Sequence, residues 1–148
     1  MDKVLPTLID GAKTVRDRHG VAARQAAAAV AQAQATLDRL QQFRAECLTR
    51  APGTQGASDG QALADYQVFL GRLDAAITQQ GHEHARRGEW AASAQQALVA
   101  SQQRLMAFET LVTRRAAVRN AKEDRKARRD TDEFAARAAR RQAQEMTE

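Results

Sequence analysis

Apolar residues recur at alternating spacings of four and three along residues 66–112. The set reads Tyr66, Leu70, Leu73, Ile77, Gln80, His84, Arg87, Ala91, Ala94, Leu98, Ser101, Leu105, Phe108 and Val112. This is the heptad spacing at which a helix keeps one seam against a partner helix. Gln80, His84, Arg87 and Ser101 depart from the apolar pattern. The spacing predicts a long helix whose seam needs a partner, and most of the remaining chain has the pattern of that partner.

A second walk of fours and threes runs from Pro6 to Arg50. Its members are Leu8, Ala12, Val15, His19, Ala22, Ala26, Ala29, Ala33, Thr36, Leu40, Phe43 and Cys47. Alanine favours helix strongly, and at a seam it buries little surface but lets backbones approach closely. We therefore expect a helix that is weakly held in its middle and anchored by Leu8, Val15, Leu40 and Phe43.

Residues 51–60, Ala-Pro-Gly-Thr-Gln-Gly-Ala-Ser-Asp-Gly, form the clear helix-breaking segment. Pro52 ends the first helix near Arg50, and Ser58 with Gln61 has the capping-box spacing that starts a second helix. We predict an all-α fold: a long antiparallel two-helix coiled-coil hairpin in which the second helix overhangs the first. As a single coiled-coil domain of residues 1–148, it has helices at about 4–50 and 61–145 and a loop at 51–60.

The lengths of the two helices predict a register and an overhang. If Cys47 lies near Leu63 across the turn, residues 26–29 face residues 81–84, so bulky polar seam residues lie over alanines. The second helix then extends beyond the first from about residue 110, by roughly 35 residues or 50 Å. The overhang holds a basic run of Arg114, Arg115, Arg119, Lys122, Arg125, Lys126, Arg128 and Arg129 against Glu123 and Asp124. This run is either a docking surface or a solvated helix face with internal ion pairs.

Composition supports a slender helical protein with an acidic partner. Aromatic residues make up 4 % of the chain, charged residues 28 %, and the net charge is +5. Such a charge suits nucleic acid, anionic lipid or an acidic protein surface. Phe134 is the only ring after Phe108, so the aromatic residues on which single-stranded nucleic acid stacks are missing from the basic run.

The sequence gives no signal of membrane insertion or secretion. The N-terminus lacks an apolar core run, and nowhere do about 18 apolar residues follow one another. We expect a cytoplasmic protein, or one peripheral to a membrane. The single cysteine, Cys47, cannot form an internal disulfide, and its place on the apolar face favours a packed thiol over a reactive one.

Catalytic and metal chemistry find no support in the pattern. His82 and His84 are two residues apart and point about 200° away from each other on a helix. No Ser/His/Asp or Cys/His set can be defended, and the glycine-containing loop lacks the Gly-Lys-Ser/Thr of a phosphate-binding loop. We therefore expect no enzyme, no cofactor and no metal.

A candidate docking surface begins at Phe69, which lies one position off the seam. With Leu73, Ala76 and Gln80 it forms a stripe at i, i+4, i+7 and i+11, which suits docking in a groove. The alternative is an aromatic residue that merely flanks the hairpin core. Trp90, directly beside Ala91, poses the same alternative.

Three blocks of the sequence resemble the FliJ family of flagellar export proteins. They are Tyr66-Gln67-Val68-Phe69-Leu70 with Leu73, Ala76, Ile77, Thr78 and Gln79; Trp90, Ala97-Leu98 and Arg104-Leu105 through Leu111; and Asp132-Glu133-Phe134-Ala135 with Arg137 and Ala138. The resemblance covers residues 66–141 in sequence and the whole chain in length and helix plan.

The resemblance implies a stalk-like, non-enzymatic coiled coil of the flagellar type III export apparatus, at the cytoplasmic face of the inner membrane. Family members insert into the hexameric ring of the export ATPase, promote its assembly, contact the cytoplasmic domain of the export gate and bind export chaperones. By position, the gate-binding stripe falls on Phe69, Leu73, Ala76 and Gln80; the family can carry a histidine where Gln80 stands. Contact of Arg114, Arg115 and Arg119 with the ring is inferred from the overhang. Two alternatives stay open: a basic helical nucleic-acid binder, and the equivalent stalk of a related type III secretion system.

Overall fold

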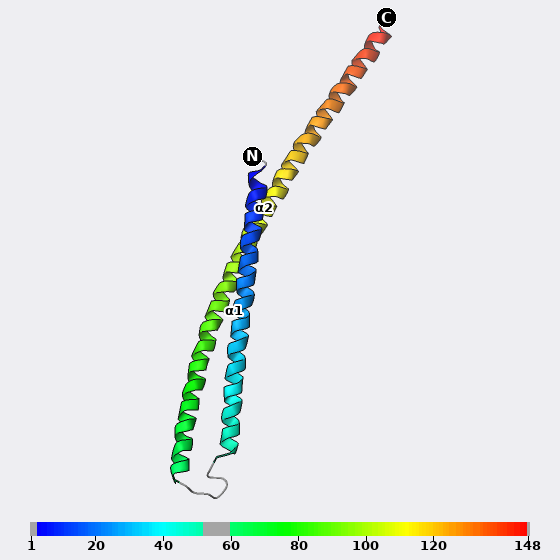
Figure 1. The fold of residues 1–148 in the computed structure, drawn as a ribbon. Coiled ribbons are helices and arrows are strands. Elements are labelled where there is room, and N and C mark those ends of the chain that lie inside the picture. The colour runs from blue at the N-terminus through cyan, green and yellow to red at the C-terminus, as the bar shows by residue number, and fades with distance from the viewer. Residues whose placement is uncertain (1–2, 52–59, 148) are drawn as a thin grey trace. The chain divides into compact units, whose positions relative to one another are not determined.

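The computed structural model describes residues 3–51 and 60–147. They form two helices, α1 (Val4–Thr49, 46 residues) and α2 (Gly60–Met146, 87 residues) (Figure 1). Pro6 lies in the first turn of α1, where its missing N–H has no intrahelical partner to lose. The expected loop and the Ser58 cap lie outside the described residues. The α1 helix ends one residue before the expected Arg50, and α2 begins one residue before the expected Gln61.

The chain divides into two compact units, Lys13–Gln102 and Met1–Ala12 with Gln103–Glu148. The expectation that residues 1–148 make a single coiled-coil domain stays a prediction.

In the unit of residues 13–102, α1 and α2 run antiparallel (Figure 1). Near the turn, the Tyr66 hydroxyl donates to the backbone carbonyl of Cys47 at 3.0 Å. Further along, Nε2 of Gln80 donates to the carbonyl of Ala33 at 3.4 Å. The predicted all-α, antiparallel hairpin is therefore confirmed.

The seam predicted for α2 is correct from Tyr66 to Phe108, because every member is buried or half-buried. Leu73 is 7 % exposed, Ser101 7 % and Leu105 4 %. Val112 is the one error, at 40 % exposed.

The seam predicted for α1 is correct at every seventh residue from Ala12 to Cys47; of the members in between, Ala22 and Ala29 are half-buried and the other four are exposed. Ala12, His19, Ala26, Ala33, Leu40 and Cys47 are buried or half-buried, and Ala26 and Ala33 are fully buried. Leu8, Val15 and Phe43 are exposed, as is Thr36. The seam residues in this second row lie one position later in the sequence: Ile9, Arg16, Ala23, Val30, Leu37 and Arg44. Arginine stems can cover apolar surface while their guanidinium groups stay in water, so Arg16 and Arg44 occupy places that hydrophobicity alone gives to Val15 and Phe43.

The predicted register is displaced toward the C-terminus of α2. The Cys47 carbonyl accepts a hydrogen bond from Tyr66, three residues beyond the expected Leu63, and the Ala29 carbonyl accepts one from Arg87. The physical idea behind the prediction holds nevertheless, because the bulky polar residues Gln80 and Arg87 lie over the alanines of α1.

In the other unit, Leu5 and Ala12 of α1 and Leu105 of α2 are the buried apolar residues. The Arg104 guanidinium lies over the Phe108 ring, 5.7 Å from its centroid, a cation–π geometry. Every residue from 117 to 147 is exposed. Over residues 3–51 and 60–147, neither helix contains a stretch that is both long and apolar enough to span a membrane.

Candidate interaction surfaces

A polar belt crosses the middle of the hairpin, formed by Gln80, Glu83 and Arg87 of α2 against Ala29 and Ala33 of α1. Nη1 of Arg87 donates to the Ala29 carbonyl at 3.0 Å, and Nε of Arg87 donates to Oε1 of Glu83 at 2.9 Å. Alanine side chains are too short to reach the opposite helix, so long polar side chains bridge the gap to the α1 backbone. The belt therefore holds the helices together where apolar burial is small.

Glu83, the carboxylate of the belt, is paired with two arginines, Arg86 and Arg87. The hydrogen bond from Arg87, helped by the charge of Arg86, lowers the pKa of Glu83 below its usual value. Arg86 also donates to Oε2 of Glu83. Because the ionised form is favoured in the folded state, this pair stabilises the hairpin only while the carboxylate keeps its charge.

The turn end of the hairpin carries an aromatic contact between the helices. The Phe43 and Phe69 rings meet edge to face, with centroids 6.1 Å apart and planes at 87°. Both side chains remain largely exposed, at 48 % and 42 %. Nearby, Nε of Arg44 donates to Oδ1 of Asp74, which raises the pKa of Arg44 above its usual value. This end therefore combines specific pairing with exposed apolar surface.

The structure separates the four residues of the predicted docking stripe into two pairs. Phe69 and Ala76 are exposed, whereas Leu73 is buried and Gln80 is half-buried and bonded to Ala33. Phe69 and Ala76 can touch a partner directly, whereas Gln80 is accessible only in part, where it lines a hollow beside Ala76. Leu73 and Gln80 instead pack α2 against α1, and α2 is the helix that carries Phe69 and Ala76.

A hollow of about 400 Å³ adjoins Ala76 on this side of the hairpin. Its lining comes from Leu40 of α1 and from Ala76, Gln79, Gln80, Glu83 and Arg86 of α2. Sequence reasoning missed Phe43 as a residue of this surface. The heptad pattern places Phe43 inside the seam, whereas in the structure it is exposed and contacts Phe69.

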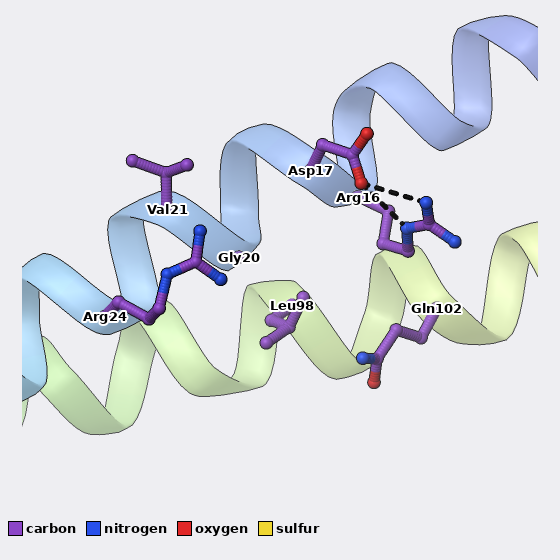
Figure 2. Close-up of a pocket in the computed structure, with 7 residues that line it drawn as sticks. All are labelled: Arg16, Asp17, Gly20, Val21, Arg24, Leu98 and Gln102. Atoms are coloured by element: carbon purple, nitrogen blue, oxygen red, sulfur yellow. Dashed lines mark hydrogen bonds and ion pairs between the residues drawn. The ribbon is translucent and has the colours of Figure 1, made fainter.

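The opposite side of the hairpin has a second hollow, of about 310 Å³, at Gly20 (Figure 2). A Cβ at Gly20 would lie 4.0 Å from Cδ1 of Leu98, an ordinary contact distance, so the glycine leaves a shallow gap over that leucine. Arg16 and Asp17, joined by an ion pair at 2.9 Å, line one end of the gap. This hollow is mostly polar and has no aromatic residue in its lining.

The basic segment, residues 114–129, is exposed throughout except for the half-buried Ala116. Arg114, Arg115 and Arg119 therefore present their charges to solvent. No ion pair within the basic segment is recorded among the described residues. The segment is an open cationic surface, suited to carboxylate or phosphate groups of another molecule.

The described residues contain no group of three or more His, Cys, Asp and Glu placed to hold a metal ion. Cys47 is free and half-buried.

These features define a class of protein: an all-helical hairpin with an exposed aromatic contact near its turn and an exposed cationic segment on its longer helix. The chain belongs to the FliJ family, because the family model described as "Flagellar FliJ protein" matches residues 1–144. Membership associates the chain with flagellar protein export. A comparison with curated proteins and another with solved structures found no match.

Proposed function

We propose that the chain is a non-enzymatic stalk and adaptor of the flagellar type III export apparatus. Its C-terminal helix inserts into the ring of the hexameric export ATPase and promotes ring assembly. Its hairpin binds the cytoplasmic domain of the export gate and the export chaperones, at the cytoplasmic face of the inner membrane. The proposal extends the family assignment, and the observation that carries it is the exposed basic segment on a helix far longer than its partner.

Ring binding is assigned to Arg114, Arg115 and Arg119. Guanidinium groups recognise carboxylates through paired hydrogen bonds, so acidic groups lining the ring are the expected partners. The triple change of these arginines to glutamate should weaken ring binding about tenfold or more, since one lost factor of ten needs only about 1.4 kcal/mol. The measurement is stimulation of ATPase activity and hexamer formation by the purified protein.

A matched control lies on the same helix. Arg137, Arg140 and Arg141 are also exposed, and their triple change to glutamate alters the net charge by the same amount. This variant should keep most of the stimulation. Equal loss in both variants would mean that total charge, and not a local contact at the basic segment, drives binding.

Gate binding is assigned to the predicted stripe of Phe69, Leu73, Ala76 and Gln80, with direct contact through Phe69 and Ala76. Phe69→Ala and Ala76→Arg should each reduce binding of the export gate's cytoplasmic domain, with the far-UV circular dichroism of the hairpin preserved. Val68→Ala is the control, because Val68 is a neighbouring apolar residue that is 57 % exposed. Undiminished binding of the Phe69 and Ala76 variants would remove this assignment.

The exposed arginines of the basic segment also fit a second function, nucleic-acid binding. Neutralising several phosphates would make the logarithm of the affinity fall steeply with the logarithm of the salt concentration. Titration of DNA at several salt concentrations separates the two functions: a steep slope with submicromolar affinity at physiological salt favours nucleic acid over the ATPase ring.

A further inference from the structure

The two sides of the hairpin differ in a way that a simple two-helix coiled coil does not require. On each helix, a flank position directly precedes every second seam residue. On α1 these positions hold Val15, Ala22, Ala29, Thr36 and Phe43; on α2 they hold Phe69, Ala76, Glu83, Trp90 and Ala97. The Phe43–Phe69 contact places the two rows on the same side of the hairpin. We call this side the aromatic flank.

The aromatic flank is apolar at all but two of its positions, Thr36 and Glu83. Positions that flank the seam of a two-stranded coiled coil are commonly charged. The opposite flank follows that polar tendency more closely. Its positions are Lys13, Gly20, Ala27, Gln34, Gln41 and Leu48 on α1, and Gln67, Asp74, Gly81, Gly88, Gln95 and Gln102 on α2. An apolar stripe widened on one side only is the pattern of helices that pack against more than one neighbour.

Aromatic residues stand at two heights of the aromatic flank. Phe43 and Phe69 lie near the turn, and Trp90 lies 21 residues beyond Phe69, at the same heptad position. Three heptads of helix span about 31 Å. Trp90 is 50 % exposed. Between the two heights the flank positions hold small residues except for Glu83, and the hollow of about 400 Å³ beside Ala76 opens there. The surface is thus a shallow groove with an aromatic residue near each end; its flank positions are mostly apolar, and the hollow within it is lined mainly by polar side chains, Gln79, Gln80, Glu83 and Arg86.

The rim of this groove is positively charged. The next positions outward from the flank, between the two aromatic heights, are Arg39, Gln32 and Gln25 on α1 and Arg72, Gln79 and Arg86 on α2. All six are exposed. The carboxylate of this stretch, Glu83, is already paired with Arg86 and Arg87. A second copy of the chain would bring its own arginines against these, whereas a helix with acidic flanks would complement them.

We infer that the aromatic flank binds an amphipathic helix of about three heptads from another protein, apolar on one face and acidic on its edges, to form a three-helix bundle. This inference rests on the docking role proposed for Phe69 and Ala76. It adds the chemistry of the partner, extends the site to Trp90, and includes Phe43 of α1. Aromatic anchors near both ends with small residues between them suit a helix laid along a groove.

The test uses the full-length chain and a synthetic 21-residue peptide with leucine and alanine at its core heptad positions and glutamate at the flanking ones. The control peptide carries lysine in place of glutamate. Trp90 is the only tryptophan, so its fluorescence reports this surface alone. The glutamate peptide should shift the emission to shorter wavelength and bind at least tenfold more tightly than the lysine peptide. Equal binding of both peptides, or no emission shift, overturns the inference.

Variants locate the site. Trp90→Ala and Phe69→Ala should each weaken the glutamate peptide at least tenfold, measured by anisotropy of a labelled peptide, while Val68→Ala leaves it unchanged. The double change Arg39→Glu with Arg72→Glu should reverse the preference between the two peptides. The charge-matched double change Lys13→Glu with Arg24→Glu, outside the groove and its rim, should not. Circular dichroism confirms that each variant is folded, and reversal by both double changes would overturn the site.

Two further outcomes separate this inference from the gate proposal and from self-association. If Phe69→Ala abolishes binding of the gate domain, while Trp90→Ala affects neither the gate domain nor the peptide, the gate site stands and the three-helix bundle fails. If peptide binding needs both residues but gate binding needs neither, the bundle stands and the gate site fails. A concentration-dependent emission shift of the chain alone, with dimer sedimentation lost in Trp90→Ala, would identify a second copy as the occupant and overturn the inference.

Discussion

Ala33 tests most directly whether small residues set the distance between the helices. Its side chain is fully buried, and its carbonyl accepts the hydrogen bond from Gln80 at 3.4 Å. Ala33→Leu adds three carbon atoms where the two backbones approach each other. Inserting extra methylene groups into a packed interior typically costs about 1–3 kcal/mol, and we expect a loss of stability in this range.

The magnitude separates packing from hydrogen bonding. At 3.4 Å the Gln80 contact is long, and an ordinary hydrogen bond contributes only about 0.5–1.5 kcal/mol net. Helix propensity changes little, since leucine is close to alanine on that scale. Ala35→Leu provides the control on the exposed face of the same helix and should change stability by no more than about 0.5 kcal/mol.

Urea unfolding followed by far-UV circular dichroism measures both variants. Ala33→Leu should lower the midpoint clearly, and Ala35→Leu should not. Adding Gln80→Ala to Ala33→Leu makes room on the facing helix and should recover part of the loss, a coupling of about 0.5–3 kcal/mol for residues in contact. If the two leucine variants unfold at the same midpoint, the close approach of the helices at Ala33 is not under packing constraint and the reasoning is wrong.

Three further predictions address the core, the backbone and pH. Leu73→Ala should destabilise the hairpin by about 2 kcal/mol or more in the same urea assay, since Leu73 is 7 % exposed and truncation of a buried leucine leaves a cavity; a change below about 0.5 kcal/mol, which is typical of surface sites, would contradict its burial. Gly71→Ala should raise stability by up to about 1 kcal/mol, because a Cβ there meets nothing within 4 Å; a lowered melting temperature would show an unseen contact. The lowered pKa of Glu83 means that its pairing stabilises the fold above the ordinary glutamate pKa of about 4.3 and is lost as pH falls through and below that value. The Glu83→Gln variant should therefore be less stable than the original chain at neutral pH, and the difference in their free energies of unfolding should shrink as the pH is lowered. A difference that stays constant with pH would refute the pairing.

The sequence predicts α2 better than α1 for a physical reason. Along α2 large apolar residues mark the seam on both sides of its polar middle, from Tyr66 to Ile77 and from Leu98 to Phe108, so the heptad is unambiguous. Along α1 the alanine run offers apolar residues at neighbouring positions, and both Ala22 and Ala23 end half-buried. Hydrophobicity favours the row that contains Val15 and Phe43 over the row one position later, which contains Arg16 and Arg44. The folded hairpin instead uses the stems of arginines.

The candidate surfaces can be predicted only in part from the sequence, because the seam of α1 is ambiguous. Phe69 is recognisable from spacing, because it lies beside a clear seam. Its partner Phe43 was assigned to the seam, so the aromatic contact between the helices could not be foreseen. Leu73 belongs both to the predicted seam and to the predicted docking stripe, and its burial follows from its place in the seam. The pairing of Glu83 with Arg87 is an i, i+4 contact of a common kind, but the bond from Arg87 to Ala29 depends on a register that spacing alone did not fix.

The alanine-lined interior has a consequence for how the two helices find their alignment. A helix moved along its mate by one heptad would still set Gln80 against an alanine, Ala26 in place of Ala33, so the middle of the hairpin scarcely distinguishes one alignment from the next. The contacts near the turn do distinguish them, because Phe43 with Phe69 and Arg44 with Asp74 are contacts between particular side chains. The contacts at the turn end therefore fix the register of the two helices. Without these contacts, one helix could shift along the other while both remain helical.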